Sequence, residues 1–224
     1  MSSLQTLSRG LHVLDIISRA PSGLAIAEIA RELGVHRAIA YRLVATLEEH
    51  LMVARDADGR IRLGAGVVAL GGNYRPQLRA ACRPVLRALA HDTAATAFLC
   101  IAEGEDCVVV EVAEPDQPML KVSYRVGSRH PVSRGAAGLA IAMQRPPAKD
   151  EPADLAEARR DGFAVTKGQL QEGAIGVAAP LARSGERVAG AEACIGVVAM
   201  HALDTDKATA ALLRHRDRLI AAID

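Results

Sequence analysis

The segment from Leu24 to Leu63 constrains the fold of this chain more than any other part of its sequence. Apolar residues that recur three and four positions apart predict a short helix over 26–33. After Gly34-Val35, a second helix is expected over about 37–49. Two helices joined by a tight turn that contains glycine form a helix-turn-helix. We therefore expect this segment to fold as a small helical unit.

A hairpin pattern directly follows the second helix. Strands are expected over 52–55 and 60–63, and Asp58-Gly59 is a strong turn signal between them. A hairpin in this place makes the helix-turn-helix a winged one, a layout typical of proteins that set one exposed helix into a DNA groove. The alternative is a small helical core without DNA contact, but a hairpin that bears arginines is uncommon in such cores.

The core of this unit can be predicted from helical spacing. A helix upstream, over about 6–18, is expected to complete a three-helix core, and Pro21-Ser22-Gly23 ends it. The side chains expected to face the core from the three helices are Leu7, Leu11, Leu14, Ile17, Ile26, Ile29, Ala30, Leu33, Ile39, Leu43, Val44 and Leu47. Those expected to point elsewhere from the last helix are Arg37, Tyr41, Arg42 and Thr46.

Composition limits the functions open to the chain. Half of its 224 residues are hydrophobic, which indicates a globular protein. Aromatic residues make up 2%, too few for a platform on which single-stranded bases stack. The net charge of +1 is low for an indiscriminate nucleic-acid coat, but it permits a groove reader with local basic residues. Every basic residue before Gly64 is arginine, which suits contacts to guanine and phosphate or else reflects a GC-rich genome.

No catalytic or metal-binding constellation emerges. The four cysteines lack a CxxC pair and are interpreted as buried, reduced thiols. The seven histidines include no HExxH motif, and His130 beside Pro131 is interpreted as a loop residue. We expect no cofactor, no metal and no enzymatic activity. Without a signal peptide or an apolar run of membrane-spanning length, a cytoplasmic protein without membrane contact is expected.

The remainder of the chain predicts an α+β domain with a mostly antiparallel sheet. A linker helix over 64–75 separates the winged unit, 1–63, from this second domain, 76–224. Helices are expected over 76–91, 135–144, 154–160 and 206–223. Strands are expected over 97–102, 106–113, 120–124, 163–165, 176–181 and 188–198.

Several ordered motifs resemble the IclR family of transcriptional regulators. Ser8 to Asp15 is similar to the first helix of that family, residues 24–53 to its recognition region, and Asp58 to Gly64 to its wing. Two later segments, 126–138 and 162–180, are similar to parts of its ligand domain. The resemblance covers nearly the full length of the chain. It implies a GAF-like effector-binding domain and a homodimer or homotetramer that represses or activates genes on double-stranded DNA.

The resemblance also implies which residues meet DNA. The recognition helix would present His36, Arg37, Ala38, Ile39, Tyr41 and Arg42, and the wing adds Arg60 and Arg62. The chain departs from the family at Ala38 and Ile39, where serine and threonine are usual. Ala25 similarly replaces a hydroxyl residue at the start of the preceding helix. Hydroxyl side chains there would cap a helix or contact phosphate. The DNA affinity or the preferred DNA sequence is therefore expected to differ from what is usual in the family.

An effector pocket is implied at matching positions of the second domain. These positions are Ser133, Arg134, Ala136, Ala137, Thr166, Gly176, Ala193 and Ile195. Because this lining has few hydrogen-bond donors, it predicts a larger, partly apolar effector, aromatic or acyl, over a small carboxylate. Arg134 is either an anchor for a carboxylate or a solvent-facing loop residue. Glu192 is either a pocket acid or a residue that faces away from the core.

A second hypothesis comes from a different functional class. The chain could be a small-molecule-binding or catalytic domain whose helix-turn-helix has lost DNA binding, and Ala38 and Ile39 motivate this alternative. Salt dependence separates the two. A regulator binds a defined operator with an affinity that falls steeply as salt rises, whereas a degenerate protein binds all duplexes equally weakly.

Overall fold

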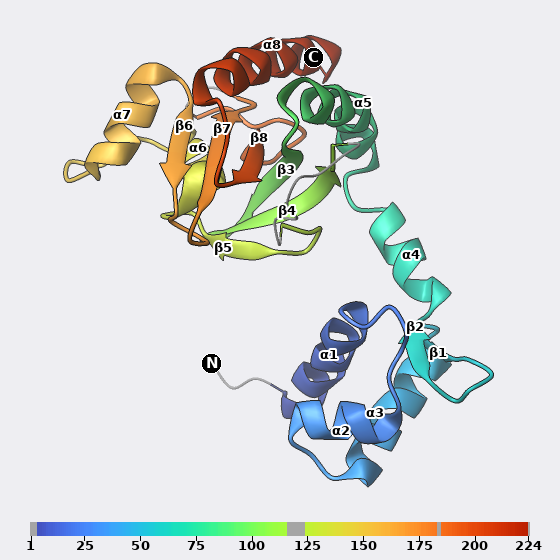
Figure 1. The fold of residues 1–224 in the computed structure, drawn as a ribbon. Coiled ribbons are helices and arrows are strands. Elements are labelled where there is room, and N and C mark those ends of the chain that lie inside the picture. The colour runs from blue at the N-terminus through green and yellow to red at the C-terminus, as the bar shows by residue number, and fades with distance from the viewer. Residues whose placement is uncertain (1–3, 116–123, 183–184, 224) are drawn as a thin grey trace. The chain divides into compact units, whose positions relative to one another are not determined.

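The computed structural model describes residues 4–115, 124–182 and 185–223, and the chain divides into two compact units, Met1–Tyr74 and Arg75–Asp224 (Figure 1). No helix among the described residues is long and apolar enough to span a membrane.

The first unit is a winged helix-turn-helix. Its elements are α1 (Gln5–Ser18), α2 (Ile26–Leu33), α3 (Arg37–Glu49), β1 (Val53–Arg55), β2 (Ile61–Leu63) and α4 (Ala65–Gly72). The predictions for α2 and α3 are confirmed at both ends of each helix. Gly34 ends α2 in the left-handed conformation, with φ of 64°, which a glycine adopts without steric cost. This turn lets α3 begin only three residues later.

Two predictions about the core of this unit are wrong. Leu7 is 60% exposed, and Leu11 is exposed to nearly the same fraction. The residues that α1 buries are instead Val13 and Ile17. In α3, Ile39 is 37% exposed, and Ala40 takes the buried position in its place. Successive residues of a helix lie about 100° apart, so a stripe assigned one position off points to the rim of the core. Periodicity gave the right helices but the wrong buried side in the first half of α1 and at Ile39 of α3.

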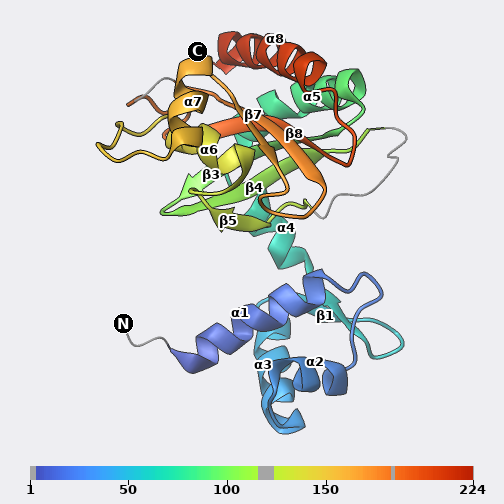
Figure 2. The same ribbon diagram turned by 60° about the vertical axis from the view of Figure 1, so that its left-hand side comes forward.

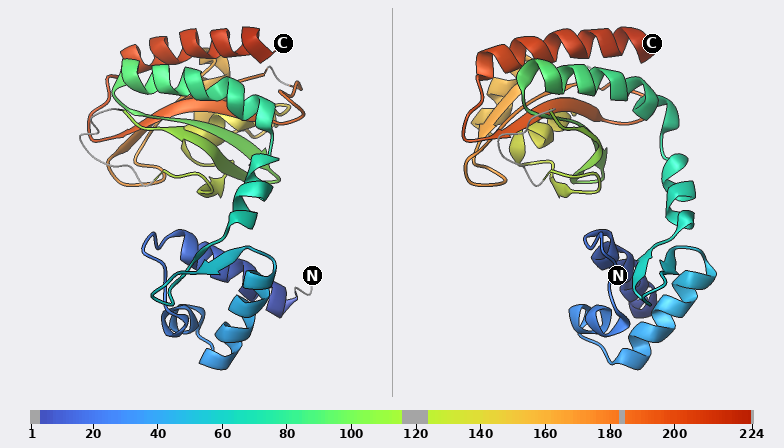
Figure 3. Two further views of the ribbon diagram at one scale, coloured as in Figure 1. Left: turned by 90° about the vertical axis from the view of Figure 1, so that its right-hand side faces the viewer. Right: turned by 45° about the vertical axis from the view of Figure 1, so that its right-hand side comes forward.

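The second unit is a six-stranded sheet between helices. Its elements are α5 (Pro76–Thr93), β3 (Thr96–Glu103), β4 (Asp106–Ala113), β5 (Arg129–Pro131), α6 (Gly135–Ala142), α7 (Ala153–Asp161), β6 (Ala164–Lys167), β7 (Ala174–Pro180), β8 (Ala193–Met200) and α8 (Thr205–Ile223). The strand order is β5-β4-β3-β8-β7-β6, and every pairing is antiparallel. The helices α5 and α8 lie side by side on one face of the sheet (Figure 3).

The opposite face of this sheet is covered by α6, with α7 beside it (Figure 2). Phe98 and Cys100 of β3 and Cys194 of β8 belong to one buried cluster with Ala136 and Ala137 of α6. Side chains alternate between the two faces along a strand, so the intervening residues point toward α5 and α8. The sheet is therefore buried on both faces and forms the middle layer of three.

Two strand predictions need correction, and a third falls largely outside the described residues. β5 was expected to be loop, yet His130 lies in this short strand and pairs with Cys107. β8 begins at Ala193, not at 188, because Val188 and Ala191 pair with each other across a tight turn. The strand expected over 120–124 lies, except for Tyr124, outside the described residues.

Candidate DNA-binding and effector-binding sites

The exposed side of α3 collects all the residues expected to meet DNA from the recognition helix. His36 is the residue that caps α3, and its side chain makes no capping hydrogen bond. The side chains of Arg37, Ala38 and Arg42 are exposed, and Tyr41 is 58% exposed. Within the described residues, the guanidinium groups of Arg37 and Arg42 have no hydrogen-bond or ion-pair partner. Both cations are therefore available to an external anion.

A shallow hollow of about 420 Å³ lies where α2 turns into α3. Arg9, Arg31 and His36 contribute to its wall, together with Gly34 and Ile39. The N-terminal end of a helix carries a partial positive charge from its unpaired backbone N–H groups. The start of α3 thus combines free backbone donors with cationic side chains, which is a setting that attracts phosphate.

The start of α2 keeps half of a capping box. Ala25 precedes the helix and has no side chain with which to cap it, but the Glu28 carboxylate accepts the Ala25 N–H at 2.7 Å. This backbone hydrogen bond, with smaller contributions from Arg60 and Arg31, holds the pKa of Glu28 below its ordinary value of 4.5. The hydroxyl half of the box is missing, as the sequence indicated, while the carboxylate half remains.

The two wing arginines that were expected to meet DNA, Arg60 and Arg62, are bound to other groups of the first unit. Arg60 Nη2 donates to the Gly23 carbonyl at 2.9 Å and lies 3.2 Å from Glu28 Oε2, while its Nε donates to the Ser22 carbonyl at 3.1 Å. Arg62 Nη1 donates to the Pro21 carbonyl at 2.7 Å, and its Nε donates to Asp56 Oδ2 at 2.8 Å. These contacts tie the wing to the loop before α2. The expected DNA-binding residues therefore fall into a free set on α3 and an internally bound pair on the wing.

In the second unit, the structure brings together three of the expected effector residues at the start of α6. Thr166 Oγ1 accepts the Ala136 N–H at 3.0 Å, and both side chains are buried. Gly176 adjoins them, since a Cβ at Gly176 would lie 3.4 Å from the Ala136 Cβ. Ala136, Thr166 and Gly176 thus form one small-residue corner between α6, β6 and β7.

Gln169 belongs to the same corner and was missed by the sequence reasoning. Its Oε1 accepts the Gly135 N–H at 2.8 Å, and its backbone carbonyl accepts a hydrogen bond from Arg134. Arg134 is exposed, as is Ser133. The loop between β6 and β7 therefore closes over the first turn of α6. No local pattern marks a glutamine in a polar loop for this role, since the contact spans 34 residues.

The remaining expected effector residues lie on opposite faces of the sheet. Ala137 lies in the buried cluster on the α6 side, and its carbonyl accepts a weak hydrogen bond from Cys194 Sγ at 3.4 Å. Ala193 and Ile195 flank Cys194 in sequence, so their side chains point to the opposite face of the sheet. Both are fully buried there. The structure thus places Cys194 beside α6, where Ala193 and Ile195 were expected.

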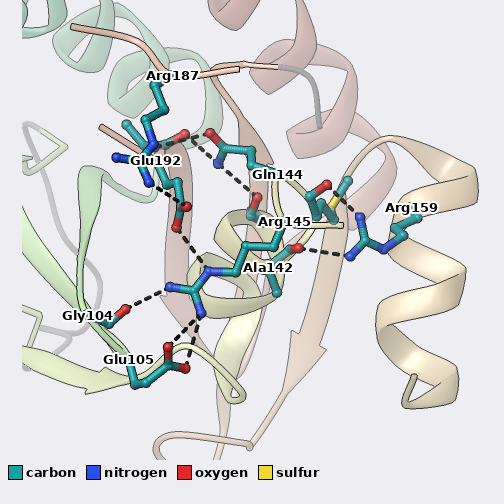
Figure 4. Close-up of polar contacts among 11 residues, drawn as sticks. Gly104, Glu105, Ala142, Gln144, Arg145, Arg159, Arg187 and Glu192 are labelled. Atoms are coloured by element: carbon teal, nitrogen blue, oxygen red, sulfur yellow. Dashed lines mark hydrogen bonds and ion pairs between the residues drawn. The ribbon is translucent and has the colours of Figure 1, made fainter. Parts of the chain in front are cut away.

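The end of α6 is fixed by two polar side chains, Arg159 and Gln144 (Figure 4). Arg159 of α7 donates to the Ala142 carbonyl at 3.0 Å and to the Met143 carbonyl at 2.7 Å, which satisfies carbonyls left free by the end of the helix. The buried Gln144 amide donates to the Ala193 carbonyl at 3.0 Å and accepts the Ala193 N–H at 3.3 Å. Gln144 thus pairs with the backbone of Ala193, the first residue of β8, in the way that a neighbouring strand would.

Arg145 joins the same region to the β3–β4 turn (Figure 4). Its guanidinium donates to the Gly104 carbonyl at 2.7 Å, to Glu105 at 3.1 Å and to Glu192 at 3.0 Å. Glu192 also lies 3.5 Å from Arg187. Of the two interpretations of Glu192, the structure therefore favours the residue outside the core, where it balances two arginines. Within the described residues, no cluster of histidine, cysteine, aspartate or glutamate is placed to hold a metal ion.

Comparison with known families decides what these two units are. Residues 6–57 match the IclR helix-turn-helix domain, and residues 74–153 match the domain described as bacterial transcriptional regulator IclR C-terminal. Together the two matches cover more than half of the chain. The chain belongs to the IclR family.

Relatives within the IclR family are regulators. The chain is 30% identical to the HTH-type transcriptional regulator Rv1719 of Mycobacterium tuberculosis, over 64% of this chain and 56% of that protein. It is 25% identical to the acetate operon repressor of Salmonella typhimurium, over 63% of this chain and 53% of the repressor. The chain thus spans a little over half the length of these relatives.

Solved IclR structures share the fold over the whole chain. An IclR homologue from Microbacterium hydrocarbonoxydans, crystallised with 4-hydroxybenzoate, superposes with a TM-score of 0.78. It is 20% identical, and the match covers 97% of this chain and 98% of that one. The expectation of a winged unit followed by a mostly antiparallel α+β domain is confirmed.

Proposed function

We propose that this IclR-family chain is a ligand-responsive, sequence-specific DNA-binding transcriptional regulator. The observation that carries the proposal is the face of α3, where Arg37 and Arg42 lie exposed without a hydrogen-bond or ion-pair partner among the described residues. We infer that α3 enters the major groove, where an arginine can make two hydrogen bonds to one guanine. The basic hollow at the start of α3 then meets the adjacent phosphates.

Footprinting on the DNA upstream of the chain's own gene tests this proposal. We expect a discrete protected site whose occupancy falls steeply between low and physiological salt. Arg42→Ala should abolish the footprint, whereas Arg218→Ala, which removes an exposed arginine of α8, should leave it intact. Equal, weak binding to every duplex by the unaltered chain would instead favour the alternative of a degenerate helix-turn-helix.

We further propose that the chain acts as a homodimer, or as a tetramer built from such dimers. Leu4, Leu7 and Leu11 are exposed along one side of α1, spaced as one helical face. Apolar side chains gathered in this way favour a protein partner, and a second copy would pair two recognition helices on two half-sites. Light scattering should give a dimer mass that Leu7→Glu reduces to a monomer, while Val68→Glu, on α4, serves as the matched control.

The second unit is proposed to bind a small, partly apolar effector at the corner formed by Ala136, Thr166 and Gly176. Support comes from the chemistry of the corner: the Thr166 hydroxyl oxygen already accepts a backbone N–H, and the other two residues offer no polar side chain. A small carboxylate would lose its hydration there without replacement. Arg134 stands at the exposed rim and is the residue available to a carboxylate that extends outward.

Thermal-shift measurements test the effector class. Aromatic and acyl acids, with 4-hydroxybenzoate among them, should raise the melting temperature more than glyoxylate or pyruvate. Gly176→Ala should reduce the shift, because its methyl group would occupy the space beside Ala136 without clashing. Ile195→Val, on the other face of β8, is the control and should keep the shift. Stabilisation by very small oxo-acids alone would refute the proposed class.

A further inference from the structure

Three of the four cysteines converge on the α6 side of the sheet. Cys100 of β3, Cys107 of β4 and Cys194 of β8 are all fully buried and belong to one core cluster. Cys100 and Cys194 are direct partners across the antiparallel β3–β8 pair. Nothing in the function proposed above uses these thiols. Their convergence is unexplained by packing alone, because cysteine offers no advantage over alanine or valine as a core filler.

A chain of polar groups leads from Cys100 to the edge of the sheet. Cys100 Sγ lies 3.4 Å from the Tyr124 hydroxyl, which lies 3.1 Å from His130 Nε2. His130 Nδ1 lies 3.1 Å from the Pro131 carbonyl oxygen, which can only accept a hydrogen bond. Nδ1 must therefore carry a proton, so neutral His130 accepts the Tyr124 O–H at Nε2. Tyr124 in turn is left to accept the Cys100 S–H.

This directed chain allows Cys100 to ionise. The Cys100 proton passes to the Tyr124 oxygen while the Tyr124 proton passes to His130 Nε2, which leaves a thiolate, a neutral tyrosine and an imidazolium. Burial opposes the ionisation, but the neighbouring polar groups of Cys107, Cys194 and Tyr124 lower the pKa of the Cys100 thiol. Cys82 offers the contrast, since burial raises its pKa to about 12. A thiolate, and not a thiol, is the reactive nucleophile.

We propose that Cys100 is a peroxide-reactive thiol, activated through Tyr124 and His130, and that Cys194 resolves it into a cross-strand disulfide. The Cys100 thiolate attacks one peroxide oxygen, so that an S–O bond forms and the O–O bond breaks. The departing hydroxide takes the proton held by His130 and leaves as water. Cys194 sulfur then attacks Cys100 Sγ, and the S–O oxygen leaves as a second water with the Cys194 proton. Two thiols are oxidised and one peroxide is reduced.

Strand geometry supports Cys194 as the resolving residue. Ala102 N donates to the Glu192 carbonyl at 2.9 Å, which makes that pair hydrogen-bonded in the ladder. Cys100 and Cys194 lie two residues further along, so they form a hydrogen-bonded pair too. Such pairs have Cα atoms about 5.5 Å apart, within the range that a disulfide spans. Their Cβ atoms are wider apart than a relaxed disulfide prefers, which makes the bond easily reduced. The full burial of the thiols selects a small, uncharged oxidant that enters by local opening.

Peptide mapping of the full chain tests the proposal, and the readout is independent of DNA binding. The reduced protein is treated with hydrogen peroxide, its remaining thiols are alkylated under denaturing conditions, and its peptides are weighed. We expect a Cys100–Cys194 cross-link that dithiothreitol reverses, while Cys82 stays alkylatable. Tyr124→Phe, which breaks the proton path, should slow the cross-linking at least tenfold, whereas Tyr74→Phe should not. In Cys194→Ser, a sulfenic acid should be trapped at Cys100 by dimedone.

Three results would overturn the proposal. Oxidation of Cys82 at the same rate as Cys100 would show that the cluster confers no special reactivity. An unchanged rate in a folded Tyr124→Phe variant would remove the activation path. Cross-linking of Cys107 to Cys194 in Cys100→Ser, at the unaltered rate, would show that Cys100 is not the reactive thiol.

Discussion

The first unit contains two pairs of arginines that look alike in sequence and differ in structure. Arg37 and Arg42 project from α3 without a partner among the described residues. Arg60 and Arg62, on the wing, are bound to the carbonyls of 21–23 and to Glu28 and Asp56. The comparison teaches that arginines are not interchangeable as DNA ligands. One pair is ready to bind phosphate or base, while the other holds together the scaffold that presents the first.

The largest effect separating the pairs is expected from Arg42→Ala. The variant should bind its operator about 10- to 100-fold more weakly, the usual loss for a base-contacting arginine. Because the Arg42 side chain makes no hydrogen bond or ion pair among the described residues, thermal stability should stay nearly unchanged. Fluorescence anisotropy with labelled operator and a parallel melting curve measure both. A loss of stability equal to the loss of binding would break the comparison.

Arg60→Ala is expected to act the opposite way. It removes hydrogen bonds to Ser22 and Gly23 and the pairing with Glu28, which should destabilise the wing by about 1 kcal/mol after allowance for partial exposure. Faster hydrogen exchange in β1 and β2 would record this. Operator binding should fall only as far as the wing opens. An exchange pattern like that of the unaltered chain, combined with lost binding, would move Arg60 into the DNA-contacting pair.

Ala25→Ser tests the missing half of the capping box at the start of α2. A serine there can cap α2 and complete the capping box with Glu28, which should stabilise the helix by about 1 kcal/mol. Hydrogen exchange of the α2 amides should slow about fivefold as a result. Ala27→Ser, on the exposed side of the same helix, is the control and should bring no gain. An equal gain from both substitutions would mean that capping is not its cause.

Glu28→Gln gives the smallest effect and a pH dependence. The pKa of Glu28 is lowered in the folded unit by the Ala25 N–H and by Arg60. The charged carboxylate therefore stabilises the fold at pH values above its ordinary pKa of 4.5. That stability is lost as the pH falls below 4.5 through the folded pKa. The gap in α2 exchange rates between the unaltered chain and Glu28→Gln should therefore close in acid. A gap that is constant from pH 7 to pH 3 would contradict this, and Glu32→Gln controls for loss of a carboxylate on α2.

The sequence predicted regular elements well where one period governs a long stretch. α2, α3 and β4 begin and end where periodicity and turn signals placed them. The sequence did not predict which face an element buries where several apolar residues compete. In α1, Leu7 and Leu11 were expected in the core, but Val13 is the buried residue. β5 was missed because its three residues, Arg129–Pro131, carry no apolar alternation at all.

The exposure of candidate site residues was predictable only where one element supplies them. Helical geometry predicted that Arg37, Tyr41 and Arg42 point away from the core, and all three are exposed on α3. The fixed state of Arg60 depends on carbonyls 37 and 38 residues away, and the cysteine cluster depends on the register of three strands. A single sequence contains no local signal for either. Family resemblance supplied positions for the effector corner, and the structure places the Ala193 and Ile195 side chains on the face of the sheet opposite to that corner.

The short β5 has a consequence for how the sheet meets other chains. An outermost strand exposes unpaired backbone groups, to which a foreign strand can add and so seed an aggregate. Here that edge is three residues long, bears Arg129 and His130, and ends in Pro131, which has no N–H to donate. The border thus offers almost no template for a further strand. The proposed homodimer can therefore form on paired DNA half-sites without its two sheets joining along this edge.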